Sequence, residues 1–152
     1  MIPKITSFLI VLAFISVNDL EKVKEKAEEY LNQNLNDPSS YEFVSLEHVH
    51  DITQEDNLNY RIDYFTDRNE SIAEDLKKLK NDLGEDVTKV ACKAYEFNFR
   101  AKNEYGALIL NKTRLFVSNE YEVRRIAYKE AQWLNSCNEL EEYREIVLKH
   151  IG

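Results

Sequence analysis

The stretch "YEFNFRAKNEYGALIL", residues 95–110, decides the fold because it has the pattern of a β-hairpin. Its first half places every second residue on an apolar face, namely Tyr95, Phe97, Phe99 and Ala101. Asn103 and Gly106 tolerate positive φ and therefore suit a tight connection. We expect residues 107–117 to return as the second strand. Which face Lys112 and Arg114 share depends on the register, and the sequence leaves this open.

The residues that flank this hairpin predict further strands and a first helix. Residues 41–50 and 121–127 have strand character, which makes an antiparallel sheet of three to four strands. Asn18 and Glu21 resemble a capping box, and an amphipathic helix is expected to begin there. Its apolar stripe consists of Leu20, Val23, Ala27, Tyr30, Leu31 and Leu35. Pro38 is the structural turn that ends it, since proline disfavours helical geometry in the preceding residue.

The middle of the chain predicts helix, with one alternative. Residues 70–83 have helical periodicity, and Gly84 suits the position just after a helix. The stripe can be extended back to residue 56, although alternation across residues 58–64 also fits a strand. A helical insertion over about 56–84 would project, fold back as a hairpin, or pair with a second chain as an oligomer contact. Ser136 and Glu139 predict the capped start of a C-terminal helix.

The first 17 residues, "MIPKITSFLIVLAFISV", predict a signal peptide, or an uncleaved anchor that would be the only membrane contact. A buried first strand is a third interpretation. We therefore expect residues 18–152 to form a single α+β domain in the cell envelope, periplasmic or secreted, or membrane-anchored by the N-terminus. Export would permit a disulfide between Cys92 and Cys137. The alternative is two separate small core residues.

Charge is unevenly distributed along the 152 residues, whose net charge is −8. Residues 89–129 hold nine basic and four acidic side chains, a balance of +5. The overall negative charge argues against nucleic acid as a partner. Arg100 and Lys102, two residues apart on one strand, are candidate binding residues for an acidic protein surface, together with Asn103 in the turn. In the alternative interpretation this positive block faces the protein's own acidic helices.

Few residue patterns point to chemistry. His48 and His50 would lie on one side of a regular strand and are weak candidates for a metal site, which would need further ligands. No Gly-x-Ser-x-Gly elbow is present, and no catalytic residue or cofactor is indicated. Trp133, in "EAQWLNS", is a candidate partner-binding residue, since tryptophans often anchor interfaces.

Two motifs together resemble a known group. "LNQNLNDPSSYEFVS" contains an Asn/Asp-Pro-x-Ser-Tyr break, and "YEFNFRAKNEYGALIL" contains Arg-Ala-Lys-Asn-x-x-Gly. The chain resembles small exported proteins of Bacteroidetes type, whose function is uncharacterised, over residues 20–50 and 90–125. The resemblance implies an envelope-associated α+β domain and no catalytic residues.

Two functions remain open at this point. The first is a non-enzymatic binding or assembly module of the cell envelope, for example a subunit of a larger complex. The second is a small hydrolase or ligand-binding enzyme whose site is assembled only in three dimensions. A pocket lined by perturbed titratable groups would favour the second, and a flat basic sheet face would favour the first.

Overall fold

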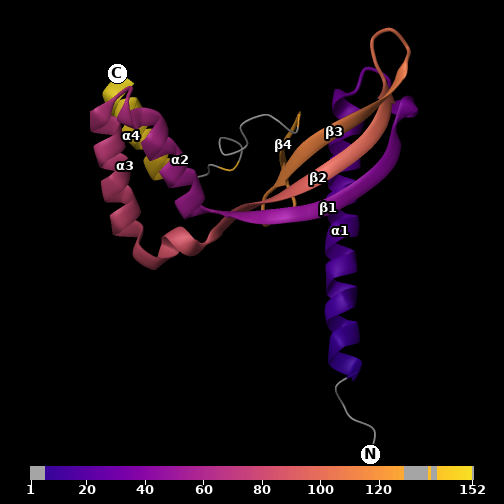
Figure 1. The fold of residues 1–152 in the computed structure, drawn as a ribbon, viewed down its shortest axis with the longest axis horizontal. Helices are drawn as coiled ribbons and strands as arrows, with labels where there is room; N and C mark the ends of the chain where they lie inside the picture. Colours follow the sequence, from indigo (N-terminus) through magenta and orange to yellow (C-terminus); the bar gives the residue numbers. More distant parts are fainter. Residues whose placement is uncertain (1–5, 129–136, 138–139, 152) are drawn as a thin grey trace, which may run out of the picture.

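A computed structural model describes residues 6–128, 137 and 140–151 (Figure 1). Within this part, helices and strands alternate along the chain in blocks, as expected of an α+β protein. The elements are α1 (Thr6–Asn34), η1 (Pro38–Ser40), β1 (Glu42–Thr53), α2 (Gln54–Thr66), α3 (Glu70–Leu83), η2 (Gly84–Thr88), β2 (Val90–Lys102), β3 (Leu108–Val117), β4 (Val123–Tyr128) and α4 (Glu141–Ile151).

The four strands form one antiparallel sheet in the order β1-β2-β3-β4. Strands that follow one another in the chain are therefore neighbours in space, although α2, α3 and η2 lie between β1 and β2 in the chain. The predicted α+β class and antiparallel sheet are confirmed. Asn98 pairs with Lys112, and Glu96 pairs with Arg114. The register thus places Lys112 and Arg114 on the same face as Arg100, the point that the sequence left open.

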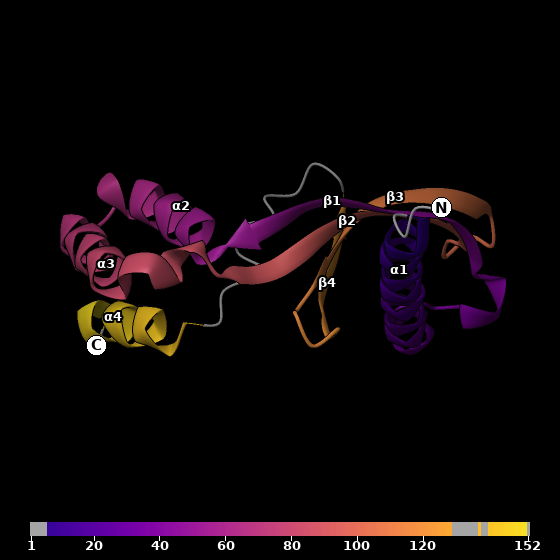
Figure 2. The ribbon, with the colours of Figure 1, turned by 90° about the horizontal axis from the view of Figure 1, so that it is seen from below.

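One face of the sheet packs against α1 (Figure 2). The apolar face predicted for β2 is buried there, with Phe97 wholly inaccessible. Its partners from α1 and β3 include Val23, Ala27, Leu31, Leu115 and Val117. The remaining part of α1, toward the N-terminus, extends away from the sheet (Figure 1). None of the helices in the described residues is long and apolar enough to cross a membrane.

The helix start predicted at Asn18 is wrong for this chain. α1 begins at Thr6 and continues through Asn18 without interruption. The apolar segment before Asn18 is compatible with helix, so the backbone N–H groups near Asn18 have helical partners and need no cap. Pro38 does lie after the helix, as the first residue of the short 3-10 turn η1.

A helical unit lies at the end of the sheet opposite the β2–β3 turn (Figure 1). It consists of α2, α3 and α4 around a core of Leu58, Ile72, Leu76 and Val87. Part-buried side chains from the three helices and from the residue before α4 complete this core, namely Ile62, Phe65, Leu79, Leu83, Leu140, Tyr143, Ile146 and Val147. The apolar stripe proposed for contact with a second chain is thus used within one chain.

The middle segment is two helices and not one continuous helix over residues 56–84. Thr53 caps α2 by accepting a bond from the Asp56 N–H, while the Asp56 carboxylate accepts from the Thr53 N–H. Asn69 then accepts a bond from the Ile72 N–H and starts α3. This second cap marks a new helix start, because it satisfies a backbone N–H group that has no partner within α3. The strand alternative for residues 58–64 is wrong, because these residues lie within α2.

Candidate functional site

The β2–β3 turn is built by the two residues singled out in the sequence. Gly106 has φ +78, a left-handed value that favours glycine. The Asn103 side-chain oxygen accepts hydrogen bonds from the N–H groups of Tyr105 and Ala107, both at 3.0 Å. Asn103 therefore organises the turn itself, which is a folding role.

Arg100 and Lys102 contact carboxylates of the protein itself. The Arg100 guanidinium lies 3.7 Å from Glu42 on β1, and the Lys102 ammonium lies 3.8 Å from Asp37 before η1. All four side chains remain substantially exposed, so each ion pair contributes little to stability. The geometry therefore favours the interpretation in which Arg100 and Lys102 face carboxylates of the protein itself. These carboxylates come from a strand and a loop, and not from the helices that were expected.

Large apolar side chains are exposed at the same end of the sheet. Tyr105 is 85% exposed, and Leu108, Ile109 and Leu110 are 47%, 42% and 47% exposed. We call these four residues the hairpin end. Leu108 and Leu110 pair with Lys102 and Arg100, so the apolar side chains lie directly beside the two ion pairs. The sequence contained this signal as "YGALIL", but alternation alone did not tell which apolar residues would remain uncovered.

His48 and His50 do not form a metal site. The register of β1 shifts between them, so that His48 pairs with Tyr95 and His50 with the adjacent Ala94. Val49 is the extra residue of a β-bulge, and it turns the two imidazoles to opposite faces of the sheet. No group of three or more metal-ligating side chains occurs among the described residues. The expectation that both histidines point to one side is therefore wrong.

The bulge instead directs His48 toward a pocket between α1 and the sheet. A hollow of about 270 Å³ is lined by Asp19 and Leu20 of α1, His48 and Asp51 of β1, and Lys93 and Tyr95 of β2. The His48 Nε2 atom is 2.9 Å from the Asp51 carboxylate. The His48 ring meets Tyr95 edge-on, with ring centroids 5.3 Å apart.

Two groups of this pocket have shifted pKa values. The pKa of Asp19 is lowered because the Tyr121 hydroxyl donates a hydrogen bond to its carboxylate, with a further contribution from Lys93. Burial raises the pKa of Tyr95 to about 12, and the negative charges of Asp19 and Asp51 add to this effect. Sequence reasoning missed Asp19, Asp51 and Tyr121 because they belong to segments far apart in the chain.

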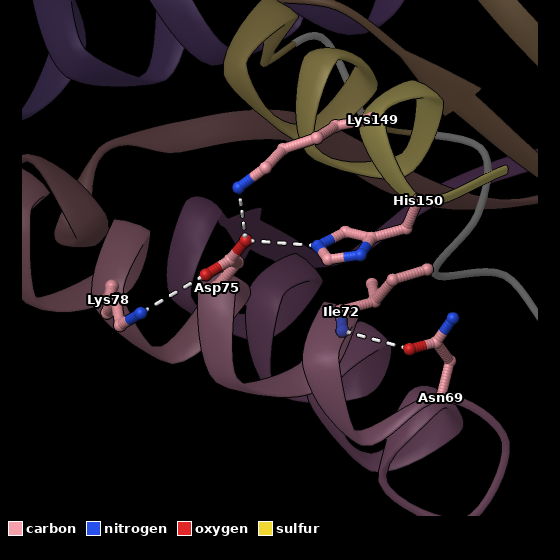
Figure 3. A network of polar contacts seen from close by, with 6 residues as sticks. All are labelled: Asn69, Ile72, Asp75, Lys78, Lys149 and His150. Carbon is pink, nitrogen blue, oxygen red and sulfur yellow. Dashed lines mark hydrogen bonds and ion pairs between the residues drawn. The ribbon is translucent and has the colours of Figure 1, made fainter. Parts of the chain in front are cut away.

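A second polar cluster joins α3 to α4 (Figure 3). The Asp75 carboxylate accepts hydrogen bonds from Lys78 and Lys149, each at 3.2 Å, and contacts the His150 Nε2 atom at 3.1 Å. The pKa of Asp75 is lowered well below its ordinary value, first by His150 and then by the two lysines. Because every partner belongs to the helical unit, the role of this cluster is to hold α4 against α3.

Cys92 and Cys137 form a disulfide, with their Cα atoms 5.6 Å apart. Both are fully buried, in a cluster with Ile52, Ala94 and Phe116 on the face of the sheet opposite α1. The bond ties the segment before α4 to the sheet. Trp133, Ser136 and Glu139 lie outside the described residues.

Comparisons with protein-family models, with curated proteins and with solved structures found no match to this chain. The resemblance to small exported proteins therefore stays a prediction, and the function has to be argued from the geometry.

Proposed function

We propose that this protein is a non-enzymatic binding or assembly module of the bacterial cell envelope, and that it holds a protein partner at the hairpin end. The observation that carries the proposal is the exposure of Tyr105 in the turn and of Leu108, Ile109 and Leu110 on the strand that follows it. Leu108 and Leu110 share one face of the sheet, and Ile109 extends the apolar surface around the edge of the hairpin. Contiguous exposed apolar patches on soluble proteins often mark sites of contact with another protein.

The surroundings of the hairpin end suit an interface. Protein interfaces have an apolar centre surrounded by a polar rim. Here the rim is supplied by the ion pairs Arg100–Glu42 and Lys102–Asp37, which are exposed and weakly held. A partner with carboxylates around an apolar patch can compete for these cations while it covers the leucines. In this proposal Arg100 and Lys102 lie at the edge of the interface with the partner, and the leucines lie at its centre.

The envelope location rests on two independent features. The first is the apolar run within residues 1–17, which is of signal-peptide length or serves as an anchor. The second is the disulfide between Cys92 and Cys137, since disulfides persist mainly in oxidising compartments. A single test addresses both: intact-mass measurement and thiol alkylation on the protein from its native host. Retention of Met1 together with free thiols would contradict the envelope assignment.

The alternative, a small hydrolase, is favoured by the pocket beside α1 and its His48–Asp51 pair. However, none of the described residues that line this pocket is a serine, threonine or cysteine. Tyr95, with a pKa of about 12, is a protonated phenol at neutral pH and a poor nucleophile. We therefore keep binding as the proposed function.

The test compares variants of the hairpin end in the native host. A tagged wild-type protein is purified, its partner is identified, and the same purification is repeated with Leu108→Ser, Leu110→Ser. The matched control is Val49→Ser, because Val49 is 43% exposed and lies on β1 outside the hairpin end. We expect the double variant to lose the partner with little change in thermal stability, and the control to retain it. Equal retention by both variants would refute the proposal.

The double change Arg100→Ser, Lys102→Ser tests the rim. Association should weaken moderately and become less dependent on salt, because two cations leave the contact. The melting temperature should change little, since exposed ion pairs contribute less than about 1 kcal/mol each. Unchanged affinity at low salt would remove these two residues from the interface.

A further inference from the structure

The pocket between α1 and the sheet is separate from the hairpin end and is not used by the proposed function. Its walls come from three elements: α1 with Asp19 and Leu20, β1 with His48 and Asp51, and β2 with Lys93. Its volume of about 270 Å³ is below the range of roughly 300–1,000 Å³ typical of pockets for drug-sized ligands. A ligand that fits here has only a few non-hydrogen atoms.

The charges of the pocket are of both signs, and one pair is loosely held. The Lys93 ammonium is 3.6 Å from the Asp19 carboxylate, beyond the usual hydrogen-bond length of about 2.7–3.2 Å. Lys93 therefore has N–H donors available for an additional acceptor. On the other side, Asp51 holds His48 at 2.9 Å through one carboxylate oxygen. A carboxylate can accept several hydrogen bonds, so Asp51 retains acceptor capacity.

The position of Asp19 is held by a contact with the connection between β3 and β4. Tyr121 has φ +67 in this turn, and its N–H donates to the Ser118 carbonyl. Its hydroxyl donates to the Asp19 carboxylate, 102 residues away in the chain. The Lys22 ammonium lies 4.0 Å from the centre of the Tyr121 ring and covers it.

We propose that this pocket binds a small zwitterion, a molecule of free amino-acid type with one ammonium and one carboxylate group. Its carboxylate binds the Lys93 ammonium, its ammonium binds the carboxylates of Asp51 and Asp19, and Leu20 packs against its methylene groups. A zwitterion offers a charged partner to both Lys93 and the two carboxylates within one small hollow, whereas a simple anion or a simple cation offers a partner to only one sign of charge. This inference is independent of the protein partner proposed above.

The test is isothermal titration calorimetry on the full chain with glycine and γ-aminobutyrate as probes. Sodium acetate and methylamine carry one charge each and serve as ligand controls. We expect at least one zwitterion to bind at least tenfold more tightly than acetate and methylamine. Lys93→Gln and Asp51→Asn should each weaken that binding at least tenfold. Lys89→Gln is the matched protein control, because Lys89 pairs with Asp86 outside the pocket and should leave the affinity unchanged.

Three results would overturn the proposal: no binding of either zwitterion at millimolar concentration, equal binding of acetate or methylamine, or equal weakening by Lys89→Gln. A second measurement uses the wild-type protein, so it does not depend on the folding of any variant. Addition of the bound zwitterion should shift the backbone amide NMR signals of Asp19, Asp51 and Lys93 and leave those of Tyr105 and Leu108 unchanged. Shifts confined to the hairpin end would also overturn it.

Discussion

Removal of the disulfide by the double change Cys92→Ala, Cys137→Ala should lower the free energy of unfolding by about 4 kcal/mol. The two cysteines are 45 residues apart in the sequence. Cross-linking a loop of that length removes roughly 13 cal/mol/K of entropy from the unfolded chain, or about 4 kcal/mol at 25 °C. Alanine is the appropriate replacement, because both sites are fully buried among apolar residues and serine would add an unpaired hydroxyl there.

Urea denaturation followed by circular dichroism measures this loss. With a slope of about 2 kcal/mol/M for a chain of this size, the midpoint should fall by about 2 M. The variant should still fold, because α4 remains attached to α3 through Asp75 and the core around Leu76. Reducing agent should produce a similar loss in the wild type and none in the variant. A change below about 1 kcal/mol would refute the reasoning that the cross-link acts by restricting the unfolded chain.

Three further changes test individual residues. Gly106→Ala should destabilise the protein by about 1 kcal/mol in denaturant melts, because φ at this residue is +78. No atom lies within 4 Å of the added Cβ, so the whole cost is that of the backbone conformation. A neutral result would contradict this reasoning. Tyr121→Phe should raise the pKa of Asp19 toward its ordinary value of 3.8 by removing the hydrogen bond, as NMR titration of the carboxyl carbon can measure; an unchanged titration would show that Tyr121 does not control it. Asp75→Asn should reduce stability at pH 7, and its difference from the wild type should close as the pH falls below about 4, since a lowered pKa stabilises only while the folded carboxylate is ionised. A difference that persisted in strong acid would assign the effect to packing.

Local sequence patterns correctly predicted the elements in which they repeat. The strand face of Tyr95, Phe97, Phe99 and Ala101 is buried, and the helix expected over residues 70–83 is α3 with the same bounds. Both outcomes follow from backbone geometry, because side chains alternate every two residues in a strand and every 3.6 in a helix. The turn at Gly106 was predictable for the same reason, since its φ is a local property of the chain.

The pocket beside α1 was not predictable, because it depends on one extra residue in β1. Without the bulge at Val49, His48 and His50 would share a face, and the metal interpretation would have stayed open. No local pattern indicates a bulge, since it is fixed by how β1 aligns with β2 across more than forty residues. The contact between Asp19 and Tyr121 likewise joins segments 102 residues apart.

The sequence by itself therefore determined the α+β class, the hairpin and its turn, and the apolar stripes that form the core. Tertiary structure alone decided which apolar residues stay uncovered at the hairpin end, which carboxylates face Arg100 and Lys102, and which charged groups line the pocket. The physical reason is the range of the interactions: periodicity and turn conformation are set by neighbouring residues, whereas exposure, strand register and ion pairing are set by the packing of distant segments.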